Sequence, residues 1–302
     1  MLQRSTLISL FLAVGLGAIA QPALGQAVAP RTLKIDSKEL EKTGLILFKE
    51  AVYLSQFQQV EPALARVKLA TQLAPKSADA WALLGGLYLS QKKVDKGISA
   101  LEKSRTLNAK NAGVHFSLGA AYFGQEKYEQ AAQLLSSGLK IKPDVPEALF
   151  DLGNTFYKMG KLKDAIKQYE KSLDQNEKFW PAINNIGLVQ YEKGNVSRAI
   201  KQWKSAIEID EKSGEPKLAL AVATYVEGDK EEGVSLAMSA LKLDGRYGKV
   251  AFLEENLWGE KLIADTKVVF ATPEIQAALS ELDVETDDGT SASTAPKDSD
   301  TP

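Results

Sequence analysis

Cysteine is absent from the 302 residues of this chain, and histidine occurs only once, as His115. Disulfide bonds, thiolate catalysis and zinc sites built from cysteine and histidine are therefore excluded. A general base needs a nucleophile or an oriented partner, and the sequence shows neither beside His115, so we expect a structural role for it. A chain of this length can bury enough apolar surface to fold through core packing alone.

An excess of either charge is also lacking, because 37 Lys and Arg residues stand against 39 Asp and Glu residues. The isoelectric point is about 5.7, whereas nucleic-acid-binding domains usually carry a basic surface. Carboxylates are frequent, but no pair is set apart in the way that glycoside hydrolysis requires. We therefore expect a protein that is not an enzyme, binds no nucleic acid, and has no cofactor, metal or catalytic site.

Charge is nearly missing from the N-terminal segment, where Arg4 is the only charged residue before Arg31. An apolar run, Leu7–Ala20, follows Arg4 and predicts a secretory signal peptide over residues 1–25. Two small residues occupy the −3 and −1 positions of its cleavage site, Ala23 and Gly25. The alternative is an uncleaved anchor, because the uncharged stretch continues to Pro30 and approaches the roughly 20 residues that a spanning helix needs. Both alternatives place the rest of the chain outside the cytosol.

The rest of the chain is organised by a period of 34 residues. In one copy the pattern reads Leu149, Leu152, Gly153, Phe156, Ala165 and Tyr169, and in the next Ile183, Ile186, Gly187, Gln190, Ala199 and Trp203. A fixed period of this length predicts stacked helix–turn–helix units. The six copies span residues 44–77, 78–111, 112–145, 146–179, 180–213 and 214–247.

Glycine or alanine recurs at one position in each half of the copies. Glycine inside a helix costs about 0.5–1 kcal/mol relative to alanine, so we expect close packing of paired helices at these positions to offset that cost. The residues concerned are Gly85, Gly119, Gly153, Gly187 and Ala221 in the first half, and Gly97, Ala131, Ala165, Ala199 and Gly233 in the second.

The pattern Trp81-x2-Leu84-Gly85-x2-Tyr88, with Ala131 later in the chain, resembles the tetratricopeptide repeat (TPR). The resemblance implies an all-α fold, a right-handed superhelical solenoid of antiparallel helix pairs. It also implies that the first helices line a concave face and that this face binds other proteins. The predicted function is therefore a non-enzymatic interaction scaffold or assembly factor.

Three recurring positions of the first helices would face this groove. We predict that they bind extended or helical segments with apolar or aromatic side chains, and that a basic residue of the partner lies near Asp151 and Glu147. The alternative is that the tyrosine ladder is ordinary core between adjacent helices. The predicted groove residues are Phe116, Phe123, Phe150, Asn154, Tyr157, Asn184, Asn185, Leu188, Tyr191 and Tyr225.

The carboxylate clamp of chaperone-binding family members is not matched. Asn154 and Asn185 fit two of its positions, but Phe150, Glu215 and Ala219 stand where the clamp needs cations. Capture of acidic chaperone tails is therefore not expected.

The period stops after residue 247. The segment Phe252–Leu262 resembles the C-terminal extension of exported or thylakoid-associated TPR proteins of cyanobacteria, which implies a periplasmic or thylakoid-lumen location. Membrane association is expected if the N-terminal segment is retained as an anchor. The alternative function is a self-associating structural component of an envelope or thylakoid membrane complex, stacked through the first copy or through the region of Trp258. The expected organisation is a signal or anchor over 1–25, a linker over 26–37, the solenoid over 38–247, capping helices over 248–283 and a disordered acidic tail over 284–302.

Overall fold

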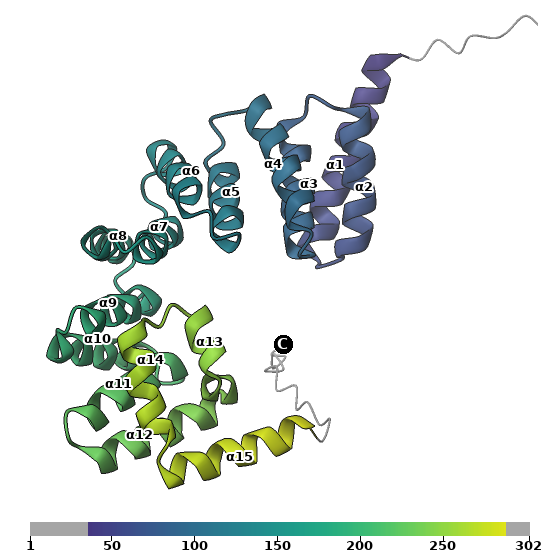
Figure 1. Ribbon diagram of the computed structural model, residues 1–302. Coiled ribbons are helices and arrows are strands. Elements are labelled where there is room, and N and C mark those ends of the chain that lie inside the picture. Colours follow the sequence, from purple (N-terminus) through teal and green to yellow (C-terminus); the bar gives the residue numbers. More distant parts are fainter. Residues whose placement is uncertain (1–35, 288–302) are drawn as a thin grey trace, which may run out of the picture.

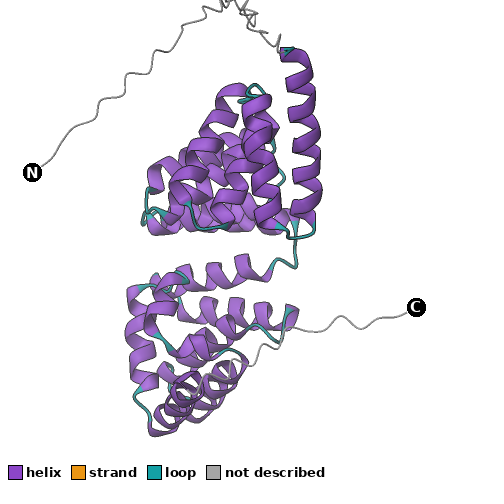
Figure 2. Ribbon diagram, turned by 90° about the vertical axis from the view of Figure 1, so that its right-hand side faces the viewer, coloured by secondary structure: helices purple, strands orange, loops and turns teal. Residues whose placement is uncertain are grey.

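The computed structural model describes residues 36–287, and all regular structure in this range is helical (Figure 2). Twelve helices form six consecutive antiparallel pairs, so the predicted all-α solenoid is confirmed. The first helices of the pairs are α1 (Ser37–Gln56), α3 (Ala78–Ser90), α5 (Ala112–Gly124), α7 (Pro146–Lys158), α9 (Trp180–Glu192) and α11 (Gly214–Val226). The second helices are α2 (Val60–Leu73), α4 (Val94–Leu107), α6 (Tyr128–Ile141), α8 (Leu162–Gln175), α10 (Val196–Ile209) and α12 (Lys230–Leu243).

The pairs stack in chain order. Each second helix packs on the first helix of the following pair, and successive first helices also contact one another. The result is an arc, with α5 and α7 on its inner side and α6 and α8 outside them (Figure 1). The inner side of the arc is therefore formed by first helices, as the resemblance implied.

The turn inside each pair follows one pattern in all six copies. One residue of each turn has a positive φ, and these residues recur every 34 positions. They are Gln58, Lys92, Glu126, Gly160, Gly194 and Gly228. The first copy, which matches the sequence pattern least well, therefore forms the same helical hairpin as the others.

Close packing at the recurring small residues is confirmed. A Cβ atom added to Gly153 would lie 2.5 Å from Cε1 of Tyr169, and one added to Gly187 would lie 2.5 Å from Nε1 of Trp203. Both aromatic side chains are fully buried. The backbone of the first helix thus forms part of the socket for the largest side chain of the second helix.

His115 has the structural role that its sequence context predicted. Its Nε2 atom lies 2.9 Å from the carbonyl oxygen of Ala109. One copy earlier, Nε1 of Trp81 donates to the carbonyl oxygen of Pro75 at 2.9 Å. Both residues fasten the start of a first helix to the loop that precedes it.

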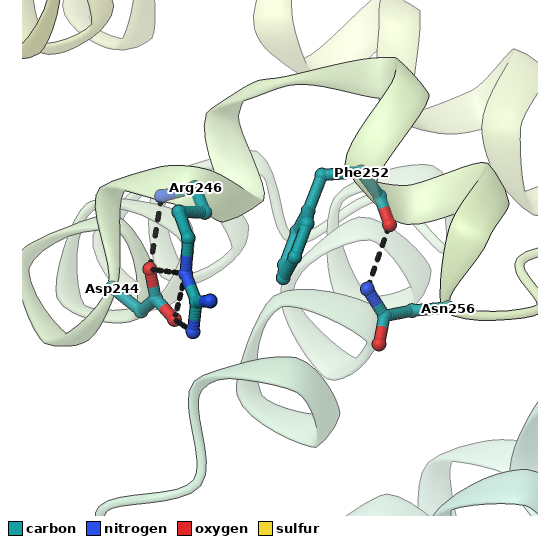
Figure 3. Close-up of polar contacts among 4 residues, drawn as sticks. All are labelled: Asp244, Arg246, Phe252 and Asn256. Carbon is teal, nitrogen blue, oxygen red and sulfur yellow. Dashed lines mark hydrogen bonds and ion pairs between the residues drawn. The ribbon is translucent and has the colours of Figure 1, made fainter. Parts of the chain in front are cut away.

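The chain turns back after α12. A 3-10 helix, η1 (Gly245–Gly248), begins at Asp244, whose carboxylate accepts hydrogen bonds from the backbone and guanidinium of Arg246 (Figure 3). The same guanidinium lies 4.9 Å from the ring centroid of Phe252 in α13 (Val250–Glu255), and the Asn256 side chain donates to the Phe252 carbonyl. These contacts fix the direction in which the chain leaves the solenoid.

Two further helices follow, α14 (Glu260–Phe270) and α15 (Pro273–Asp287). α15 packs on α12, and it continues four residues beyond the expected end at residue 283, because helix propagation adds one hydrogen bond per residue once a helix has started. Residues 1–35 and 288–302 lie outside the described range, so the predicted signal, almost all of the linker and most of the tail lie outside it too. No helix between residues 36 and 287 is long and apolar enough to cross a membrane.

α14 lies on the inner side of the arc, against α9 and α11 (Figure 1). Glu192 of α9 accepts hydrogen bonds from the backbone N–H groups of Lys261 at 3.1 Å and Leu262 at 3.0 Å, at the N-terminus of α14. A carboxylate at this end also interacts favourably with the helix dipole. Tyr191 donates to Asp265 at 2.7 Å, so α14 is held to α9 by polar contacts on two of its turns.

A partly buried carboxyl group joins the segment before α14 to α11. Trp258 Nε1 donates to Glu215 Oε1 at 3.2 Å. Burial raises the pKa of Glu215 to about 7, and hydrogen bonds from Trp258 and Asn184 offset part of that rise. Below about pH 7 the neutral form of this carboxyl group is therefore favoured in the folded protein.

Two glycine substitutions test the helix packing. Gly187→Ala should destabilise the protein by about 1–3 kcal/mol, because the new Cβ overlaps the buried Trp203. Gly86→Ala is the matched control, since a Cβ there meets nothing within 4 Å, and it should stabilise the protein by about 0.5–1 kcal/mol. Urea unfolding measures both, and an effect of the same sign for the two variants would contradict the packing argument.

Glu215 should make stability depend on pH. Its pKa is about 7 in the folded protein and near the ordinary 4.5 when unfolded, so its stabilisation is complete below about pH 4.5 and is lost as the pH rises through about 7. Glu215→Gln keeps an acceptor for Trp258 but cannot ionise. In urea unfolding, the free energy of unfolding of this variant minus that of the wild type should increase by on the order of 2 kcal/mol between about pH 5 and pH 8. An advantage that does not change with pH would contradict the assignment.

Candidate functional site: the concave groove

The groove is described by three positions that recur on the first helices from α3 to α11. They are occupied by Ala82, Gly86 and Leu89 on α3, Phe116, Ala120 and Phe123 on α5, Phe150, Asn154 and Tyr157 on α7, Asn184, Leu188 and Tyr191 on α9, and Leu218, Val222 and Tyr225 on α11. On α3, α5 and α7 all nine residues reach solvent at least in part. We call this surface the open groove.

The same positions are closed on α9 and on most of α11. Leu188 is 1% exposed and Tyr191 is 0% exposed, and both belong to one core cluster with Leu218, Val222 and Leu262 of α14. Tyr225, at the far edge of α11, remains partly exposed. α14 thus occupies the part of the concave face that a bound peptide would occupy on α3, α5 and α7.

Four of the ten predicted groove residues therefore need a correction. Asn184, Asn185, Leu188 and Tyr191 are buried, and in this structure they are not available to a partner. The physical reason is that the chain's own C-terminal segment covers the apolar surface of α9 and α11 and supplies Asp265 as the acceptor for the Tyr191 hydroxyl. Phe116, Phe123, Phe150, Asn154, Tyr157 and Tyr225 are partly exposed.

The asparagines are linked to one another. Asn154 Oδ1 accepts from Tyr169 at 2.8 Å and from Asn185 at 2.9 Å, and Asn184 donates to Asn185 at 3.1 Å. This ladder crosses from α7 to α9 at the point where the open groove ends. Its hydrogen bonds fix the spacing of the two helices, so these amides act first as structural groups.

The end of the open groove is acidic. Burial raises the pKa of Asp151 to about 6, and the nearby charge of Glu147, one helical turn earlier on α7, raises it further. Burial also raises the pKa of the Tyr157 hydroxyl, with a smaller contribution from Glu192, so this hydroxyl remains a donor. A cation brought to Asp151 would favour the ionised carboxylate, which is the arrangement expected for a basic residue of a partner.

The residues that hold α14 were not identified from the sequence. Glu192, Glu215 and Asp265 look like ordinary solvated carboxylates when only their neighbours in the chain are known. The one available signal was the apolar character of Leu218 and Val222 at groove positions. Between residues 36 and 287, no cluster of three or more histidine or acidic side chains could hold a metal ion.

Family models match three parts of the chain. A TPR repeat model matches residues 121–160, and two tetratricopeptide repeat models match residues 47–112 and 146–179. No curated protein matches the sequence.

Solved structures share the fold. One is YrrB, described as a TPR protein with an unusual peptide-binding site, with 23% identity and a TM-score of 0.52 over 58% of this chain and 90% of YrrB. MamA aligns with 25% identity and a TM-score of 0.51 over 54% of this chain and 95% of MamA. The pilF protein of Pseudomonas aeruginosa aligns with 20% identity and a TM-score of 0.59 over 73% of this chain and 98% of pilF.

The helix pairs, their constant 34-residue register and the family models all indicate the same kind of repeat. This chain is built of tetratricopeptide repeats.

Proposed function

We propose that this protein is a non-enzymatic scaffold or assembly factor that holds a segment of a partner protein in the open groove of α3, α5 and α7. The observation that carries the proposal is the difference between the two parts of the concave face. Equivalent positions are buried on α9 and, except for Tyr225, on α11, whereas on α3, α5 and α7 they are all at least partly exposed. Exposed aromatic and apolar side chains gathered on a concave surface mark interaction sites.

The chemistry of the partner follows from the residues of the open groove. Phe116, Phe123 and Tyr157 offer large contact area at low cost in side-chain entropy, which suits an apolar or aromatic segment in helical or extended form. Asp151 and Glu147 favour a basic residue at one end of that segment. α14 is an example, within this chain, of a helix bound to the concave face, because it is an amphipathic helix that packs on the same face of the next two repeats. The description of YrrB as a peptide-binding TPR protein supports the same use of the fold.

The proposed location is outside the cytosol, in the periplasm or the thylakoid lumen, as for the exported cyanobacterial proteins that the C-terminal segment resembles. The support is the sequence of residues 1–25, with one charge followed by an apolar run and small residues at the cleavage site. Membrane association follows only if this segment is retained. N-terminal sequencing of the protein purified from its native cells decides between removal and retention.

Filling the open groove should abolish partner binding. Ala120→Arg places a long, charged side chain at an exposed groove position of α5 without removing any core contact. Partner recovery from native extract should fall at least tenfold, roughly 1.4 kcal/mol or more of binding free energy. Affinity purification with quantitative mass spectrometry measures it.

The matched control is Ala277→Arg, the same change at an exposed position of α15. It should recover partners as the wild type does. Circular dichroism should show the same helicity for both variants. Equal recovery by the Ala120 variant and the control would place the binding surface elsewhere.

A further inference from the structure

Large apolar side chains are exposed along α1 and at its C-cap residue, Phe57. Ile46 is 50% exposed, Tyr53 is 61% exposed and Phe57 is 59% exposed. They are seven and four residues apart, so they form one stripe on the helix. The rings of Tyr53 and Phe57 contact each other, with centroids 4.8 Å apart. This stripe, together with the adjacent surface of α2, is the outer face of the first pair.

The 34-residue register identifies the positions in later copies that correspond to Ile46 and Tyr53. One copy later, Ile46 corresponds to Ala80 and Tyr53 to Leu87, which are 0% and 6% exposed. Both belong to a core cluster that also contains Leu64 of α2. In α3 these positions are therefore covered by the second helix of the preceding pair. The equivalents in the next three copies are also buried, namely Val114, Ala121, Ala148, Thr155, Ala182 and Val189.

No helix pair precedes α1 in the described range of residues 36–287. The terminal repeat of a solenoid is usually polar on its outer face. Here the stripe carries isoleucine, tyrosine and phenylalanine where most later copies carry smaller residues. A surface of this kind is an interaction site.

An ion pair lies on the same face. Arg66 Nε of α2 is 3.0 Å from Glu50 Oε2 of α1, and the two side chains are 52% and 49% exposed. Their equivalents one copy later, Leu84 and Ala100, are core residues. An exposed pair contributes little to the stability of one chain. It does give adjacent helices of the outer face opposite charges, with a hollow between them that both residues line.

We propose that the outer face of the first pair binds a second copy of the same face. A two-fold axis that lies in the interface, parallel to α1 and α2 and midway between them, puts α1 of each copy opposite α2 of the other. Each Glu50 then faces Arg66 of the other copy, and the stripe of Ile46, Tyr53 and Phe57 is covered on both. Such an isologous contact closes on itself.

Head-to-tail stacking is not available as an alternative. The other end of the solenoid is covered by the C-terminal helices, and Trp258, in the region that the sequence offered for self-association, is 5% exposed.

The size of the outer face also suits a dimer. α1 is about 30 Å long, α2 is about 21 Å long, and each helix is about 10 Å wide. This gives roughly 500 Å² per partner, which reaches the total of roughly 1,000 Å² expected of a specific interface.

Sedimentation velocity of the whole protein across the micromolar range tests the proposal. The wild type should change from one to two chains per particle as concentration rises. Tyr53→Glu buries a charge in the contact and should remain a single chain. Val268→Glu is the matched control, because Val268 is 56% exposed on α14, and it should behave as the wild type does. Circular dichroism should show unchanged helicity for both variants.

Charge reversal tests the arrangement within the dimer. E50R alone places like charges opposite each other across the two-fold axis and should weaken association at least tenfold. E50R with R66E restores opposite charges and should recover it.

Three results would overturn the proposal. They are a wild type that stays a single chain throughout, a Tyr53 variant that still dimerises, and a doubly reversed variant as weak as the single one. A wild type that stays a single chain but dimerises once residues 1–35 are removed would identify those residues as the occupant instead. None of these results affects the groove, because the groove variant Ala120→Arg lies on a different face.

Discussion

Each first helix in this protein depends on the second helix of the preceding pair to bury one of its apolar faces. Ala80, Leu84 and Leu87 of α3 share a cluster with Leu64 and Val67 of α2, and the other junctions repeat this contact. Because every pair interacts almost only with its neighbours, stability is close to a sum of pair and junction contributions. The small residues at Gly153 and Gly187 set the separation within pairs, and the junctions set the curvature of the arc. The concave groove follows from both.

The two ends of such a stack need separate solutions. At the C-terminal end, α15 covers α12, and α14 turns into the concave face over α9 and α11. The cap therefore has a second effect, since it removes α9 and most of α11 from the binding surface. Glu192 and Glu215 contribute to both effects, because each binds the returning segment through a carboxyl group of the groove wall.

The fold could be predicted from the sequence because its determinants are local and repeated. The 34-residue register, the glycines opposite Tyr169 and Trp203, and the role of His115 all follow from residues close together in the chain or one period apart. The closed state of Tyr191 could not be predicted, because its cover comes from Lys261 and Asp265, about two repeats later, after the period has ended. The interface between α1 and a second copy also required exposed fractions, since Ile46 and Tyr53 resemble ordinary core residues in the sequence.

The turn geometry within the pairs divides the molecule in two. The three N-terminal turns use Gln58, Lys92 and Glu126 at the position with positive φ, and the three C-terminal turns use glycine. A residue with a side chain in this conformation costs about 1–2 kcal/mol. This cost falls on the turn of each of the three N-terminal hairpins and is avoided in the turns of the three C-terminal hairpins, where glycine occupies the position. The open groove spans both kinds of hairpin, because α3 and α5 precede turns with a side chain at this position and α7 precedes a turn with Gly160.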